Sequence, residues 1–173
     1  NETDVVMYEG SADQITEADF IRVNVLCGAV VTDQGLIEGC AAELARLKAS
    51  LSSTVKIWAD LDVKHAQPLV SFDDTQFLSD LIYRGRADCV ILSGSGTGQP
   101  TCPVRVNQLK ETASVPIVVG SGITERNLDQ YHADVLIVGT SIKNGINIDP
   151  EKAGRLVERR NQARLPKSLE VQD

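Results

Sequence analysis

The segment Val55-Lys56-Ile57-Trp58-Ala59-Asp60 is the strongest indication of the fold class. Read as a strand, it has one aliphatic face, while Lys56, Trp58 and Asp60 lie on the other. Ile21-Arg22-Val23-Asn24-Val25 repeats this alternation. A central strand of an open parallel sheet buries aliphatic side chains on both faces. Polar residues along one face of two strands instead favour a (β/α)8 barrel, whose interior leads up to a site.

Strand, turn and helix alternate outward from these two stretches, which predicts a parallel sheet covered by helices. We predict strands over 20–26, 55–61, 89–92, 117–119 and 135–138. Helices are expected over 36–51, 72–84, 104–112, 125–131 with Thr124 as its N-cap, and from Pro150 onward, where Asp149 is the cap.

A complete barrel takes about 250 residues, and this chain has 173. We therefore expect an α/β fold made of the C-terminal five or so βα units of a (β/α)8 barrel, with the N-terminal part missing. The partial barrel is expected to cover residues 19–165. Residues 1–18 form a poorly patterned segment before it, and residues 166–173 form a tail.

The formal net charge of −7 argues against a nucleic-acid partner. Arginines 155, 159, 160 and 164 are interleaved with glutamates, which is typical of a solvated helix face. The four cysteines show no C-x-x-C spacing, so we expect reduced thiols, a cytoplasmic location and no metal site. No apolar run approaches the ~20 residues of a membrane helix. The sequence motifs indicate no particular cofactor.

Two apolar runs end in small-residue turns that face the same edge of the predicted sheet. They are Ile117-Val118-Val119-Gly120-Ser121-Gly122 and Leu136-Ile137-Val138-Gly139-Thr140-Ser141. Glycine lets a backbone approach a ligand closely, and N–H groups at the start of a helix bind anions. In barrels the phosphate site is frequently built from the loops after the last two strands. The predicted phosphate-binding residues are Gly120, Ser121, Gly122, Gly139, Thr140 and Ser141; the alternative is two ordinary tight turns.

A third glycine-rich stretch follows the strand at 89–92. We predict that Ser93, Gly94, Ser95 and Gly96 form a loop over the pocket. The alternative is an ordinary connecting loop. No Gly-Lys-Ser/Thr follows, so this is not a Walker loop.

The candidate catalytic residues are Asp60, Asp62, Lys64, His65 and Asn24. Catalytic groups of barrel enzymes lie where strands meet their loops, which is where these residues are expected. Two carboxylates can raise each other's pKa, a lysine can hold an anion or form a Schiff base, and a histidine can move protons. The alternative is an ion pair of Lys64 with a carboxylate. Asp33 in the preceding loop is more typical of a helix N-cap than of an acid or base.

These motifs together resemble the BtpA family. The resemblance rests on Phe20-Ile21-Arg22-Val23-Asn24-Val25-Leu26, Thr32-Asp33-Gln34-Gly35, Val63-Lys64-His65-Ala66, Ser93-Gly94-Ser95-Gly96-Thr97-Gly98 and Val138-Gly139-Thr140-Ser141. It implies a phosphate-binding TIM barrel. The cyanobacterial namesake of the family is a membrane-associated factor that stabilises the photosystem I reaction-centre proteins.

Three functions follow as alternatives. The first is an enzyme, lyase/aldolase-like or isomerase-like, acting on a small phosphorylated sugar or related metabolite. The second, implied by the resemblance, is a non-catalytic assembly or stability factor with a membrane-protein partner and peripheral membrane association. The third is an inactive fragment of a longer protein. The sequence leaves a homo-oligomer open.

Overall fold

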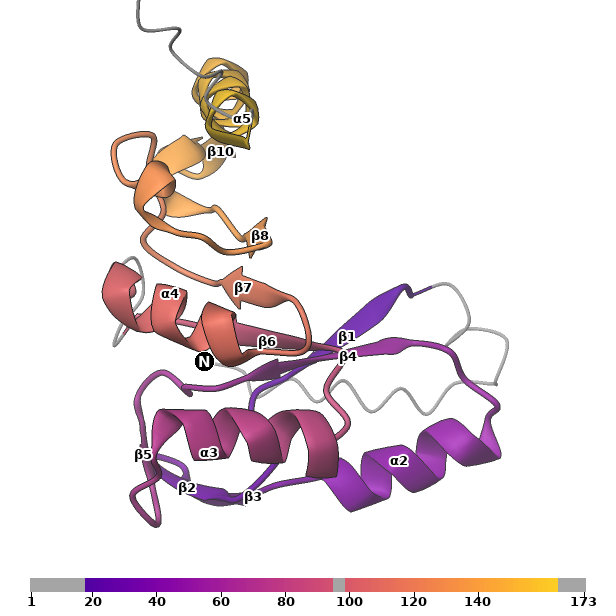
Figure 1. The fold of residues 1–173 in the computed structure, drawn as a ribbon. Helices are drawn as coiled ribbons and strands as arrows, with labels where there is room; N and C mark the ends of the chain where they lie inside the picture. Colours follow the sequence, from indigo (N-terminus) through magenta and orange to yellow (C-terminus); the bar gives the residue numbers. More distant parts are fainter. Residues whose placement is uncertain (1–17, 95–98, 165–173) are drawn as a thin grey trace, which may run out of the picture.

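A five-stranded parallel sheet forms the centre of the protein in a computed structural model, which describes residues 18–94 and 99–164 (Figure 1). The five strands occur in the same order in the sheet as along the chain. This singly wound order is that of a barrel, whereas a doubly wound sheet reverses its strand order. The strands, in sheet order, are β1 (Phe20–Val23), β4 (Lys56–Asp60), β6 (Cys89–Leu92), β7 (Ile117–Val119) and β8 (Val135–Leu136).

Helices follow most strands and bury one face of the sheet. They are α2 (Ala41–Ser50), α3 (Asp74–Ser79) with a π-helical turn over Asp80–Arg84, α4 (Pro103–Thr112) and α5 (Pro150–Arg164). Val23, Ile57, Val90 and Val119 belong to the same core as Leu81, Leu109 and Leu156 of the helical segments. The aliphatic face of the strands therefore packs on the helices, as the alternation predicts.

The other face of the sheet carries the polar and aromatic residues. Arg22 lies opposite Trp58 in the parallel register, and the rings of Phe20 and Trp58 stack with centroids 3.9 Å apart. Beyond Trp58, a small cluster of Cys89, Ile91 and Val118 continues this face. Among the described residues, no helix contributes to that cluster. One helix-covered face and one mixed face are the arrangement of a barrel wall.

Two aspartates, Asp88 and Asp134, make the same kind of contact at the amino-terminal edge of the parallel sheet. Asp88 precedes β6, accepts the backbone N–H of Ile57 and pairs with Lys56. Asp134 precedes β8 in the same way, accepts the N–H of Ile117 and pairs with Lys110. Each carboxylate thus satisfies the first free donor of a neighbouring strand.

A second, antiparallel sheet lies over the carboxyl ends of β1 and β4. Its strands are β2 (Ala29–Thr32), β3 (Gly35–Glu38) and β5 (Ala66–Pro68), in the order β3-β2-β5. The prediction of a helix over 36–51 was therefore wrong in its first residues. Asp33 lies in the β2–β3 turn and α2 is preceded by Cys40, so the expected capping role of Asp33 was also wrong. A local hairpin outcompetes the helix because Gly35, at a φ of 114°, suits a tight turn.

The segment after β7 also differs from its prediction. In place of a helix over 125–131 there is one 3₁₀ turn, Leu128–Gln130. Asn127 bonds back to the N–H of Thr124 and to the carbonyl of Gly122, and these side-chain bonds hold the backbone as a loop. Thr124 is therefore not an N-cap.

The last segment follows its prediction more closely. Asp149 accepts the N–H groups of Glu151 and Lys152 and caps α5. A short hairpin of β9 (Lys143–Asn144) and β10 (Asn147–Ile148) precedes it, and β8 leads into a 3₁₀ turn at Thr140–Ile142. No helix within the described ranges is long and apolar enough to cross a membrane.

Candidate functional site

The two predicted phosphate turns line one cavity, here called the glycine pocket, with a volume of about 310 Å³. It lies between the loops that follow β7 and β8. Lys64, from the loop after β4, also lines it. All six predicted phosphate-binding residues are in its wall, which is formed by Lys64, Gly120, Ser121, Gly122, Ile123, Thr124, Ile137, Val138, Gly139, Thr140 and Ser141.

The serine hydroxyls of these turns already have partners within the protein. Ser121 accepts the N–H of Gly94 and donates to the carbonyl of Gln99, and Ser141 donates to the carbonyl of Ile123 at 2.6 Å. By contrast, the backbone N–H groups of Gly122, Thr140 and Ser141 have no acceptor among the described residues. The turns therefore offer a ligand backbone donors, with the serines holding the loops in place.

The predicted loop over the pocket is fixed at both of its ends. Ser93 is buried, and Gly94 donates to Ser121 of the next loop. At the far end, Pro100 packs so closely on Gly122 that a Cβ there would lie 2.3 Å from the Cα of Pro100. Ser95 and Gly96 lie outside the described residues, so the prediction of a covering loop is untested at its tip.

Asn24, Asp60 and Asp62 line a second cavity of about 140 Å³, here called the roofed pocket. It lies at the carboxyl ends of β1 and β4, below the small antiparallel sheet. Its apolar wall includes Val30 of β2 and Phe77 of α3. Three of the five candidate catalytic residues are thus brought together, in a cavity that β2 and β5 of the small sheet partly close.

Asp60 is the most deeply buried carboxylate of this group, with 3% of its side chain exposed. The guanidinium of Arg22, from β1, donates to both of its oxygens at 2.9 and 3.1 Å. Burial disfavours the charged form and raises the pKa of Asp60 to about 6, against the opposing effect of Arg22 and of Lys64. Asp60 is therefore poised to hold or release a proton near neutral pH.

This raised pKa predicts an unusual pH dependence of stability. The folded carboxyl binds its proton below about pH 6, whereas the unfolded one releases it above about pH 4, so this group's contribution to stability falls as pH rises between the two. Relative to Asp60→Asn, the wild type should lose roughly 2–3 kcal/mol of unfolding free energy from about pH 4 to about pH 7. Urea unfolding of both proteins across this range measures it. A pH-independent difference between them would contradict the prediction.

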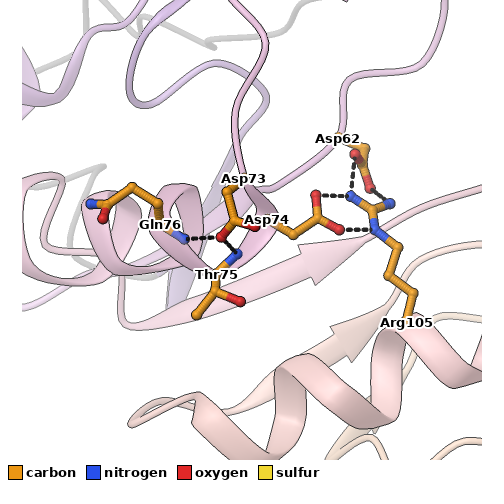
Figure 2. A network of polar contacts seen from close by, with 6 residues as sticks. All are labelled: Asp62, Asp73, Asp74, Thr75, Gln76 and Arg105. Atoms are coloured by element: carbon orange, nitrogen blue, oxygen red, sulfur yellow. Dashed lines mark hydrogen bonds and ion pairs between the residues drawn. The ribbon is translucent and has the colours of Figure 1, made fainter.

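Asp62 is engaged in an ion network that ties three elements together (Figure 2). Arg105 of α4 donates two hydrogen bonds to Asp62 and two to Asp74, the first residue of α3, at 2.5 to 3.0 Å. These bonds from Arg105 hold the pKa of Asp74 below its usual range. The neighbouring Asp73 caps α3 through the N–H groups of Thr75 and Gln76. Asp62 thus joins β4 to both helices.

Lys64 and His65 diverge after the strand. Lys64 is half-buried, lines the glycine pocket and acts electrostatically on Asp60, so it lies between the two cavities. His65 is exposed, has a φ of 57° and belongs to the wall of neither cavity. Nowhere in 18–94 or 99–164 do three or more His, Cys, Asp or Glu residues gather as a metal site.

Four residues that shape the site were not among the predicted ones, and Arg22, the partner of Asp60, is the first of them. Arg105 and Asp74 come from two helices, and no local pattern connects them to Asp62. Asn127 was detectable, because Thr124 followed three residues later by Asn127 is a spacing at which side chains bond the local backbone.

The comparisons with known proteins agree on the fold and on the ancestry of the chain. The structure of N-(5'-phosphoribosyl)anthranilate isomerase from Pyrococcus furiosus, a TIM barrel, superposes with a TM-score of 0.51 at 17% identity, over 70% of this chain and 57% of that one. This likeness concerns the fold alone. It identifies the five-stranded sheet as part of a barrel wall.

Sequence relatives are much closer. An uncharacterized protein of Pyrococcus abyssi is 49% identical over 74% of this chain and 49% of its own length. The photosystem I biogenesis protein BtpA of Synechocystis is 45% identical over 82% of this chain and 52% of its own. The chain thus spans about half the length of these relatives. The model of the BtpA family matches residues 7–162. The chain therefore belongs to the BtpA family.

Proposed function

We propose that this protein binds a small phosphorylated metabolite, with the phosphate in the glycine pocket and the rest of the molecule directed toward Asp60. The observation that carries the proposal is that both glycine turns and Lys64 line one cavity. These residues come from the loops after three different strands. Their convergence is what a ligand site at the carboxyl ends of parallel strands requires.

The chemistry of the cavity suits a phosphate group. Backbone N–H groups of Gly122, Thr140 and Ser141 have no acceptor within the described ranges, and donors of this kind cradle phosphate oxygens. Lys64, from the loop after β4, adds a positively charged residue to the wall of the pocket. Charge-assisted hydrogen bonds to phosphate are about twice as strong as neutral ones.

The same geometry favours an isomerase-like proton transfer over a Schiff base. Asp60, with a pKa of about 6, has both protonation states available near neutral pH, as a general acid or base needs. Lys64 lies between Asp60 and the glycine pocket and is better placed to hold the phosphate and steady the charge of Asp60. Asn24, beside Asp60 in the roofed pocket, adds a hydrogen-bonding side chain for the substrate.

Inorganic phosphate tests the proposal directly. At ten times its Kd, a ligand stabilises a folded protein by about 1.4 kcal/mol, a rise in Tm of roughly 3–6 °C for a chain of this size. Lys64→Met should weaken phosphate binding at least about tenfold, because a charge-assisted bond is lost. Calorimetric titration and thermal melts with phosphate measure both.

A matched control removes the same charge elsewhere. Lys56 begins β4 at the opposite end of the strand and is exposed, so Lys56→Met should leave the phosphate response unchanged. No stabilisation of the wild-type protein by phosphate or any sugar phosphate would refute the proposal. An equal loss of phosphate binding in Lys64→Met and Lys56→Met would show that binding depends only on the overall charge of the protein.

Two observations favour a second candidate, a protein-assembly role. The Synechocystis relative carries the name photosystem I biogenesis protein, and apolar side chains are exposed on and beside the small sheet: Val31, Leu36, Leu69, Val70 and Phe72. In this role the protein would bind a membrane-protein partner through that surface. Co-purification with membranes should then survive Lys64→Met and be lost in Leu36→Asp. The reverse result would connect membrane binding to the glycine pocket.

A further inference from the structure

A second groove, here called the basic groove, adjoins the glycine pocket and is lined by four cations and one carboxylate, Glu125. It has a volume of about 750 Å³ and lies between the loop after β7 and helix α5. The cations that line it are Arg126, Lys152, Arg155 and Arg159. In a chain whose net charge is −7, four cations along one groove are a local excess of positive charge.

The arginine-rich part of α5 is largely exposed, as predicted for a solvated helix face, and one side of it also lines the groove. Lys152, Arg155 and Arg159 are spaced three and four residues apart, which places them on the same side of the helix. That side faces the loop carrying Arg126. Three of the cations have partners within the protein: Arg155 is 3.6 Å from Glu125, Arg159 pairs with Asp129, and Lys152 donates to the carbonyl of Lys143. Arg126 has no ionic partner among the residues that the structure describes, so its charge is available to an added anion.

The groove and the glycine pocket share two wall residues, Thr124 and Ser141. The hydrogen bond from Ser141 to the carbonyl of Ile123 holds the two loops together at this boundary. A ligand with one phosphate in the glycine pocket would therefore present its next group to the basic groove. The three arginines and the lysine in the groove outnumber its one carboxylate, Glu125, and arginine side chains are well suited to bind a second anionic group.

We propose that the ligand of this site is a diphosphate ester rather than a monophosphate. This inference rests on the proposed function. The first phosphate occupies the backbone cradle of Gly122, Thr140 and Ser141, and the second is bound by Arg126 and Arg155 across the Thr124–Ser141 boundary. The remainder of the ligand extends from the first phosphate toward Lys64 and Asp60.

Inorganic phosphate and pyrophosphate are the probes that test it. Wild-type protein should bind pyrophosphate at least about tenfold more tightly than phosphate by calorimetric titration. In Arg126→Met/Arg155→Met, pyrophosphate affinity should fall to within about twofold of phosphate affinity, while phosphate affinity itself stays unchanged. Both arginines are exposed, so the double variant is expected to fold. A control outside the groove is Arg84→Met, which removes one positive charge from a residue that lines neither cavity and should retain the tenfold preference.

The possible results distinguish failure of the diphosphate inference from failure of the proposed function. Binding of phosphate with no preference for pyrophosphate overturns the diphosphate inference and leaves the proposed function standing. A preference that survives in the double variant, or that Arg84→Met also removes, overturns the assignment to the basic groove. If neither anion binds, the proposed function fails and this inference fails with it.

Discussion

Replacing Gly122 with alanine is expected to destabilise the protein by roughly 2–4 kcal/mol and to abolish phosphate binding. Gly122 has a φ of 70°, a conformation that costs an L-residue about 1–2 kcal/mol. A Cβ there would also lie 2.3 and 2.4 Å from backbone atoms of Pro100. Backbone atoms cannot rotate away as the end of a side chain can, so the two loops must separate. The N–H groups of the proposed cradle would separate with them.

Gly145 provides the matched control for this substitution. Its φ of 62° is nearly the same, but nothing lies within 4 Å of the position of its Cβ. Gly145→Ala should therefore cost only the conformational part, about 1 kcal/mol, and leave phosphate binding intact. Urea unfolding gives both stabilities, and calorimetric titration gives both affinities. Equal losses of stability at the two positions would show that the contact with Pro100 has no energetic consequence.

The parallel sheet was predictable from the sequence because its determinants are local. Apolar and polar residues alternate in β1 and β4, which matches burial of one face of these strands. The continuous apolar run of β6 matches burial of both of its faces. The β2–β3 hairpin was missed for the opposite reason. Leu36 and Ile37 fit the helical spacing of the residues that follow, although the turn Thr32-Asp33-Gln34-Gly35 is a hairpin signal. Pairing with β5, more than thirty residues later, then stabilises the strand.

The site was predictable where it depends on strand ends and not where it depends on long-range pairs. Every βα turn falls at the same edge of a parallel sheet, so the two glycine turns had to lie near each other. Asp60 and Asp62 seemed equivalent in the sequence. The structure separates them, because Asp60 faces Arg22 in the buried interior and Asp62 meets Arg105. The ion pair of Asp62 with Arg105 forms only because α3 and α4 pack against the sheet.

Because Asp62 pairs with Arg105, Arg105→Met is the other substitution from which we expect a large loss of stability. The substitution removes four charge-assisted hydrogen bonds and leaves Asp62 and Asp74 facing each other, half-buried and unpaired. We expect a loss of about 3 kcal/mol in unfolding free energy at neutral pH. The control is Arg84→Met. Arg84 is 81% exposed and 3.8 Å from Asp80, so its removal should cost less than about 0.5 kcal/mol.

The pH dependence identifies the cause of that loss. Arg105 lowers the pKa of Asp74, so the stabilisation by this pair is complete above the unfolded pKa of about 3.9 and is lost as pH falls through the lower folded value. The cost of Arg105→Met should therefore shrink as the pH falls below about 4. A cost that is the same at acid and neutral pH would assign the effect to lost packing of the arginine side chain instead.

The same network predicts how the two aspartates divide their roles. Because both oxygens of Asp62 accept from Arg105, Asp62→Asn should lower stability by about 1.5–3 kcal/mol and leave phosphate affinity unchanged. Asp60→Asn, by contrast, should abolish turnover of a phosphorylated substrate at unchanged phosphate affinity, since it removes the proposed proton carrier and not the proposed phosphate cradle. Loss of turnover in Asp62→Asn without loss of stability would reverse the assignment. It would make Arg105 the residue that orients a catalytic carboxylate rather than one that fastens α3 and α4 to the sheet.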